Sequence, residues 1–483
     1  MLDMLEISVF IIMSGVSLLN FMIVNPSLAS SHDDENNKIL YYFPPEADID
    51  TQLRNVGRVE ALIKFTGTFQ PNGPLNCLHT QKTRQYFLEP EPNFWMIMTI
   101  SVPITPLDDG TMVPMTPLDD GTMGYLSDVL NDNVYQAILL QCYQMFRLFM
   151  NTFASTMNVK DSVIDVRPLK TRLNQFFPKY LATVQLNSAD ISDAFQGIQF
   201  FPMDKLAFSK VHSLVNAIEN EFPFVSHSVV LYQEQLIWSA LAKSDMQIFY
   251  QYLVTSLLPS QRGSASSNFL TGPPHLNEDN LGKVPRVFLQ DTTLEEAFVV
   301  VYKLNGICLA LFIEVTVLIY VMPKVKIIPN TCSVFLLLYS YIVFFLVYLY
   351  AYLSSRLTHL AADLQEQQRP NSCTSFRFLY FNRLNLSGRS TLHFAGLNGK
   401  KNSVLSSVPD YMNTIADLSA DAERHGHGET IVKTSSDCWI MSRIADQREL
   451  FVVLNQKKAN LTDVHEEVRR LCSTNFNNIF YVE

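Results

Sequence analysis

The chain has 483 residues, of which 48% are hydrophobic and 17% charged, and its 36 basic and 46 acidic side chains give a net charge of −10. This length exceeds what one hydrophobic core normally serves, so we expect two to four domains. The acidic balance argues against a general nucleic-acid-binding protein, which needs a basic face. Seven scattered cysteines without a CxxC pair indicate reduced thiols in a cytosolic protein.

An apolar stretch from Ile7 to Val24 lies near the start of the sequence. It resembles a secretory signal peptide with a cleavage site at 28–30, but the preceding MLDMLE carries two acids and no Lys or Arg, the wrong charge for such a peptide. We favour a buried first strand, Leu18 to Pro26, behind an apolar leader, residues 1–17, whose status stays open. An acidic loop and a second strand, Lys38 to Phe43, follow.

The first block, residues 18–184, continues with a helix that Asp50 is placed to cap, with Val56 and Val59 along its inner side. Further along we predict strands at Cys77–Lys82, Arg84–Leu88 and Phe94–Ile104, a long helix at Leu126–Met157, and a helix from Pro168 with Leu169, Leu173, Phe176 and Phe177 inward. The direct repeat TPLDDGTM, at 105–112 and 116–123, has turn chemistry and predicts a duplicated surface loop rather than an acidic metal site.

The second block, residues 197–368, begins with a predicted strand in IQFFPMDK. A hairpin, a helix, a Ser/Gly/Pro-rich loop, two strands and a closing helix follow. We place them at Val225–Tyr232 with Gln235–Ala240, Asp245–Leu257, Pro259–Pro274, Arg286–Gln290, Ala297–Lys303 and Leu353–Gln368.

Two apolar segments interrupt this block. Cys332 to Leu353 has no charge and is long enough to span a bilayer, and Ile307 to Met322 is nearly as apolar, broken only by Glu314. Taken alone, the pair predicts a helical hairpin in a membrane.

The third block, residues 374–483, has the clearest pattern. We predict strands at Phe376–Asn382, Glu429–Lys433, Asp437–Arg443 and Glu449–Asn455, helices at Pro409–Glu423 and Leu461–Cys472, and an apolar strand-like end at Phe476–Val482. Each block thus combines a mainly antiparallel sheet with helices, which predicts an α+β chain built from one repeated domain type.

Seven segments also carry a family resemblance: NVGRVEALIKFTGTF, LHTQKTRQYFLEPEPNFWM, GIQFFPMDK, QLIWSAL, FLTGP, FLYFNRLNLS and VVLNQKKANLTDVHEEVRRLCSTNFNNIFYVE. In this order they are similar to the Ccz subunit of the Mon–Ccz complex. The resemblance implies three longin-like (roadblock/profilin-like) domains, a Mon-type triple-longin partner, and guanine-nucleotide exchange on a late-endosomal or vacuolar Rab GTPase. It further implies a cytoplasmic protein recruited peripherally to late endosomes, lysosomes or vacuoles during endosome maturation and fusion.

The resemblance stops near Glu314 and resumes near Leu353, so 315–352 looks like an insertion in the second domain. Three explanations stay open: a retained intron, a true membrane anchor, or an unusual buried element. The corresponding alternatives for function are a membrane-anchored protein and a longin trafficking scaffold without exchange activity.

An exchange factor needs a shaped surface with polar anchors and aromatics rather than a catalytic group. We therefore predict no catalytic, cofactor-binding or metal-binding residue, and no phosphate-binding loop or hydrolase motif is present. The interface candidates for Mon and Rab are His79, Lys82, Arg84, Glu91 and Trp95. The alternatives are core packing for Trp95 and a solvated strand edge for the other four.

Two weaker signals lie in the third block. His425 and His427 in a polar loop are a poor candidate for a metal pair. Lys457-Lys458 and Arg469-Arg470 are candidates for contact with acidic phospholipid, with a solvated helix face as the alternative.

Overall fold

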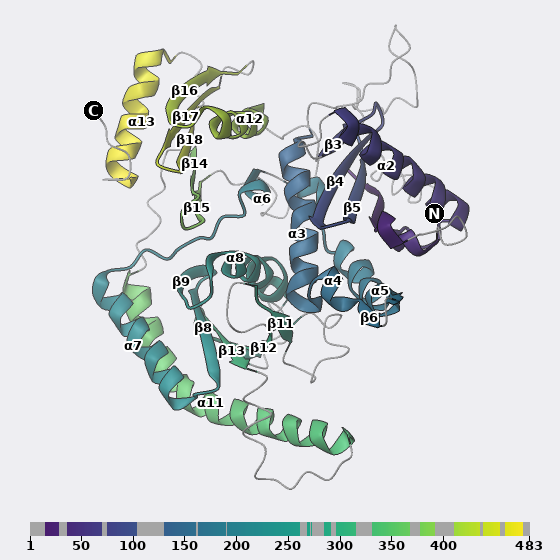
Figure 1. Cartoon of the computed structure of the whole chain (residues 1–483). Coiled ribbons are helices and arrows are strands. Elements are labelled where there is room, and N and C mark those ends of the chain that lie inside the picture. Colours follow the sequence, from purple (N-terminus) through teal and green to yellow (C-terminus); the bar gives the residue numbers. More distant parts are fainter. Residues whose placement is uncertain are drawn as a thin grey trace, which may run out of the picture.

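Three antiparallel sheets, each packed with helices, make up the computed structural model (Figure 1). The α+β prediction of three sheet-and-helix units is therefore confirmed. The structure describes residues 15–28, 36–69, 75–103, 130–160, 163–189, 191–260, 268–270, 272, 285–290, 296–314, 331–367, 377–391, 410–434, 438–454 and 459–476. Most of the leader, the TPLDDGTM repeat, most of the Ser/Gly/Pro-rich loop, residues 315–330 and the apolar end lie outside these ranges.

The first sheet has the strand order β2-β1-β5-β4-β3. Its strands are β1 (Leu18–Val24), β2 (Ile39–Phe43), β3 (Cys77–His79), β4 (Thr83–Glu91) and β5 (Phe94–Ser101). Helix α2 (Ile49–Phe69) covers one face through Val56 and Val59, as the sequence predicts. Helices α3 (Asp132–Met150) and α5 (Arg167–Leu181) cover the other face.

Three helix boundaries in this unit differ from the prediction. Helix α3 begins at Asp132 instead of Leu126, because Asn131 caps it by accepting from the Asn133 amide at 3.1 Å. Asp48, not Asp50, caps α2, because its carboxylate accepts from the Thr51 amide at 3.0 Å. Helix α3 ends at Met150 because Asn151 adopts a left-handed φ of 71°, and α4 (Phe153–Thr156) starts a separate turn. The minor elements here are η1 (Pro26–Leu28), β6 (Asn158–Lys160), β7 (Val163–Asp165), η4 (Leu186–Ser188) and α6 (Ile191–Phe195).

Helix α3 is buried between the first and second sheets, and one apolar core extends across both (Figure 1). The ring of Phe149 lies 4.8 Å from that of Tyr252 in the second unit. Arg147 contacts the buried Asp245 at 3.5 Å, and the other carboxylate oxygen of Asp245 accepts from the Gln290 amide at 2.9 Å. The first two units therefore share a core and a buried ion pair.

The second sheet runs β10-β12-β13-β8-β9, with β11 also paired to β12. Its strands are β8 (Val225–Tyr232), β9 (Gln235–Ser239), β10 (Phe269–Leu270), β11 (Arg286–Phe288), β12 (Glu296–Leu304) and β13 (Ile307–Glu314). The predicted hairpin is β8–β9, and both turn residues, Gln233 and Glu234, have positive φ as tight hairpin turns require. The predicted strand after Gly197 is wrong: only isolated bridges at Ile198 and Phe200 form there.

Strand β13 corrects the membrane-hairpin interpretation of Ile307–Met322. Residues Ile307–Glu314 form a central strand, paired on one side with β12 and on the other with β8. Seven of its eight residues are buried. Because both faces of the sheet are covered, the strand is apolar throughout instead of alternating, which is why it resembled a membrane segment.

Helices cover both faces of this sheet. Helix α8 (Lys243–Gln251), the π-helical turn η5 (Tyr252–Leu257) and α9 (Leu258–Ser260) lie on the side that faces α3. Helices α7 (Lys205–Glu221) and α11 (Thr331–Gln367) lie on the other.

Helix α11 begins 22 residues before the predicted Leu353, since it starts at Thr331. Its later turns pack into the second core through Leu349, Leu353, Leu357, Leu360 and Leu364. Among the helices of the described residues, none is long and apolar enough to cross a membrane.

The third sheet runs β15-β14-β18-β17-β16. Its strands are β14 (Arg377–Asn382), β15 (Ser387–Ser390), β16 (Gly428–Lys433), β17 (Trp439–Ala445) and β18 (Arg448–Leu454). Helix α13 (Leu461–Asn475) packs on one face, and α12 (Asp410–His425) with α6 packs on the other (Figure 1). The four predicted strands and two predicted helices of this block are present, whereas the predicted strand-like end, Phe476–Val482, lies almost wholly outside the described residues. Strand β15 was missed because SGRS lacks an apolar pattern.

Candidate partner-binding site

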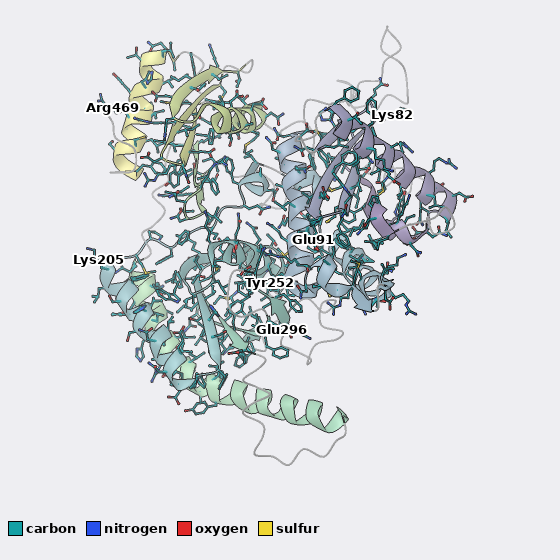
Figure 2. All side chains as sticks on the ribbon, in the orientation of Figure 1. Lys82, Glu91, Lys205, Tyr252, Glu296 and Arg469 are labelled. Carbon is teal, nitrogen blue, oxygen red and sulfur yellow. The ribbon has the colours of Figure 1, made fainter. Side chains whose placement is uncertain are left out.

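The five interface candidates lie on β3, β4, β5 and their turns in the first sheet, but they do not form one patch. Lys82 is exposed in the turn between β3 and β4, whereas Glu91 lies at the opposite end of β4 (Figure 2). Trp95 follows on β5, after the turn at Asn93. Sequence analysis grouped them because they are near neighbours along the chain. In the fold, the length of β4 separates the residues at its two ends.

His79 and Arg84 are cross-strand neighbours at the Lys82 end. The His79 side chain is 46% exposed, and its Nε2 lies 2.8 Å from Oδ2 of Asp132, the first residue of α3. Arg84 is only 8% exposed. His79 and Lys82 therefore present side chains to solvent, and Arg84 supports the surface from below.

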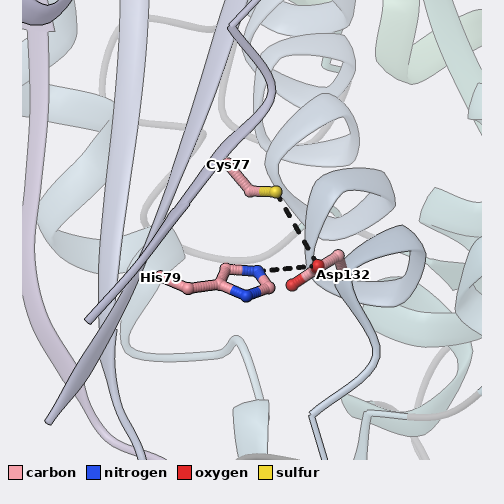
Figure 3. A group of neighbouring side chains, drawn as sticks. All are labelled: Cys77, His79 and Asp132. Carbon is pink, nitrogen blue, oxygen red and sulfur yellow. Dashed lines mark hydrogen bonds and ion pairs between the residues drawn. The ribbon is translucent and has the colours of Figure 1, made fainter. Parts of the chain in front are cut away.

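The Asp132 carboxylate is shared by three side chains, and Figure 3 shows two of them, His79 and Cys77. Besides His79, the thiol of Cys77 donates to Oδ2 at 3.7 Å, and the hydroxyl of Tyr86 donates to Oδ1 at 3.1 Å. Burial first, and then the neighbouring Asp132, raise the pKa values of the Cys77 thiol and the Tyr86 hydroxyl. Sequence reasoning missed this cluster because Asp132 is 53 residues from His79.

This Cys-His-Asp group does not have the geometry of a cysteine nucleophile with its base. A catalytic cysteine needs a base within hydrogen-bond reach of sulfur and a lowered pKa. Here the imidazole and the thiol both point at the carboxylate, and the pKa of Cys77 is raised. The neutral thiol is thus a hydrogen-bond donor that links β3 to α3.

Glu91 bonds within the protein. Its Oε1 accepts from the Tyr143 hydroxyl at 2.9 Å and the Phe153 amide at 2.6 Å, and its Oε2 accepts from the Ala154 amide at 2.9 Å. The carboxylate therefore satisfies the free amides at the start of α4 and fixes α4 beside α3. Its role in this structure is to position these helices.

Trp95 faces the α2 side of the sheet, paired in register with Val24. It is half-buried against the cluster formed by Val56, Val59 and their neighbours. This packing agrees with the alternative in which Trp95 is a core residue of its strand, although part of the ring stays at the surface.

The outer surface of α2 carries a feature that sequence reasoning missed. Ile49, Phe65 and Phe69 are 61%, 62% and 74% exposed, and the rings of Phe65 and Phe69 lie 4.8 Å apart in an edge-on arrangement. Phe65 and Phe69 share one side of the helix, and we call these two residues the α2 apolar face; Ile49, in the first turn, projects from a different side. The available signal was helical phase: Phe65 and Phe69 fall four residues apart, off the side occupied by Val56 and Val59.

Comparison with known protein families matches all three sheets. Residues 18–151 match the first longin domain of INTU, CCZ1 and HPS4. Residues 225–327 match Intu longin-like domain 2, and residues 372–471 match Intu longin-like domain 3.

Whole-length relatives agree. A vacuolar fusion protein CCZ1 homolog from Nematostella vectensis is 39% identical, covering 96% of this chain and 98% of the relative. The homologs from Xenopus laevis and Dictyostelium discoideum are 38% and 25% identical, covering 97% and 96% of this chain and 98% of each relative. The chain therefore belongs to the family of vacuolar fusion protein CCZ1 homologs, built on three longin domains.

Proposed function

We propose that this protein acts in vacuolar fusion and vesicle trafficking as a non-catalytic subunit of a guanine-nucleotide exchange complex for a late-endosomal or vacuolar Rab GTPase. The observation that carries the proposal is end-to-end similarity to proteins named for vacuolar fusion, across all three longin domains. The proposed partner is a Mon-type triple-longin subunit.

Exchange needs no covalent chemistry. A factor that binds the nucleotide-free GTPase more tightly than the loaded GTPase shifts that equilibrium and releases the nucleotide. Displacing a switch loop removes Mg²⁺ and phosphate contacts. The work of this chain is then to hold a rigid surface, and the core that joins its first two domains is suited to that.

We assign the α2 apolar face to the Mon-type subunit. Its two phenylalanine rings contact each other and are largely exposed to water, and apolar anchors of this kind dominate binding free energy at interfaces. His79 and Lys82, at the solvent-exposed β3–β4 turn, are proposed as polar contacts to Mon or Rab. Arg84, Glu91 and Trp95 are proposed to shape that surface from inside.

Recruitment is proposed to be peripheral, from the cytoplasm to late endosomes, lysosomes or vacuoles. Arg469, labelled in Figure 2, and Arg470 lie on α13 of the third domain. Arg470 is 3.7 Å from Glu467. The two arginines are the described candidates for contact with acidic phospholipid; Lys457 and Lys458 lie outside the described residues.

A binding measurement tests the exchange proposal without following turnover. The co-purified complex with a Mon-type subunit is titrated with a late-endosomal Rab in its nucleotide-free, GDP-bound and GTP-bound forms. An exchange factor binds the nucleotide-free form most tightly. Equal affinity for all three forms would support a trafficking scaffold instead.

A further inference from the structure

Three potential metal ligands converge at the junction of β3 and α3. Cys77 and His79 are separated by one residue on β3, so their side chains project from the same face of the strand. Asp132 comes from the start of α3. Their ligand atoms all lie within 4.8 Å of one another, and among the residues that the structure describes this is the one such group of three (Figure 3).

We propose that Cys77, His79 and Asp132 bind a divalent cation of the zinc class. Thiolate, imidazole and carboxylate are the three ligand types that proteins offer to Zn²⁺, with metal–ligand distances of about 2.0 to 2.3 Å. A tetrahedral ion at those distances holds its ligand atoms roughly 3.3 to 3.6 Å apart. The separations of 3.7 Å from sulfur to Asp132 and 2.8 Å from His79 to Asp132 are each within about 0.6 Å of that range.

The surroundings supply the other needs of such a site. His79 is 46% and Asp132 35% exposed, which leaves a path for the ion and a fourth coordination position for water or a group from another protein. The Tyr86 hydroxyl donates to the second oxygen of Asp132 and so orients the carboxylate, as outer-shell partners of metal ligands do.

Charge sets the class of ion. Arg84 and the positive end of α3 oppose a cation here, so two anionic ligands are needed to offset them. Thiolate and carboxylate provide two negative charges. Because the thiol must lose its proton to become a ligand, the step is Cys–SH + M²⁺ → Cys–S–M⁺ + H⁺, with the proton going to solvent. A soft sulfur ligand favours Zn²⁺ over Mg²⁺ or Ca²⁺.

A metal here would join the short edge strand β3 to the helix that forms the shared core of the first two domains. It would thereby fix the β3–β4 turn that carries Lys82. This inference does not rest on the proposed exchange function.

The test uses the full chain, freed of metal with a chelator and titrated with ZnCl₂ by calorimetry and with CoCl₂ by absorption spectroscopy. We expect one saturable site per chain and a thiolate-to-cobalt charge-transfer band in the near ultraviolet. Cys77→Ser should remove that band. His79→Asn should lower the affinity at least about ten-fold. The control is His359→Asn, an exposed histidine on α11, which should bind normally.

A second measurement needs no variant. Zn²⁺ at one equivalent should protect Cys77 of the wild-type chain from alkylation, with Mg²⁺ giving no protection, as read by peptide mass spectrometry. Unprotected Cys77, no saturable binding, or binding equally strong in the Cys77→Ser and His79→Asn variants would overturn the proposal.

Discussion

Replacing Phe65 and Phe69 by Ser should weaken binding of the proposed Mon-type partner and leave the chain folded. The two rings are 62% and 74% exposed and contact each other at 4.8 Å on the outside of α2. The buried side of the helix, at Val56 and Val59, is unchanged by the substitution. The variant therefore separates partner binding from folding.

The size of the effect follows from the exposed area. A phenylalanine presents about 200 Å² in all, so roughly 120 Å² of Phe65 and roughly 150 Å² of Phe69 are available to a partner. At about 25 cal/mol per Å², covering both completely is worth up to about 7 kcal/mol. Interface contacts deliver part of such totals, so we expect about 1 to 3 kcal/mol for each ring, or between roughly 30-fold and roughly 2 × 10⁴-fold in Kd for the pair.

The assay is surface binding or calorimetry with the purified Mon-type subunit, alongside thermal melting of the free variant. Leu461→Ser serves as the matched control, because Leu461 is an apolar residue 55% exposed on α13 of the third domain. A Kd for the Phe65→Ser/Phe69→Ser chain within about two-fold of wild type, with melting unchanged, would refute the assignment of the α2 apolar face.

Three further predictions concern the fold. Leu357→Ala in α11 should lower the stability of the second domain by about 2 to 5 kcal/mol, measured by hydrogen exchange in β13. The control, His359→Ala at an exposed position of the same helix, should change that stability by less than about 0.5 kcal/mol. Equal effects of the two substitutions would mean that α11 does not pack against this sheet. Gly197→Ala would place a Cβ 2.9 Å from the Gly388 Cα, so the two backbone segments should separate and limited proteolysis near residue 197 should accelerate; unchanged proteolysis would argue against this contact. The control, Gly57→Ala, adds a Cβ in open space and should stabilise α2 by about 0.5 to 1 kcal/mol. Burial lowers the pKa of His227, although the nearby charges of Glu219 and Asp245 act in the opposite direction. The unfolded chain therefore binds more protons than the folded chain as pH falls through about 6.5, so the free energy of unfolding should decrease there. His227→Asn should reduce this dependence of the free energy of unfolding on pH, and an unchanged dependence would contradict the prediction.

Local patterns predicted α2 and the β8–β9 hairpin. The apolar positions of α2 repeat at helical spacing, and a short turn joins the two apolar runs of the hairpin, so the sequence located both. Strand β13 has no solvated face, and its continuous apolar run could not be told from a membrane segment until its two neighbours in the sheet were known.

The candidate site was harder to predict, because spacing along the chain is not spacing in the fold. LHTQKTRQYFLEPEPNFWM pointed to the correct sheet, yet the β4–β5 hairpin sends Glu91 to α4 and Trp95 to α2, away from His79. The Asp132 cluster depends on how α3 docks against β3, which no local pattern encodes. The resemblance to the Ccz family, by contrast, rested on segments from all three domains and was confirmed.

The most direct test of the exchange proposal is the rate of fluorescent GDP release from a late-endosomal Rab. The Rab is mixed with this chain alone, with the Mon-type subunit alone, or with both, at equal concentrations. The proposal predicts release at the intrinsic rate with either subunit and a strong acceleration only when both are present. A stable, well-folded complex of the two that leaves GDP release at its intrinsic rate would contradict it.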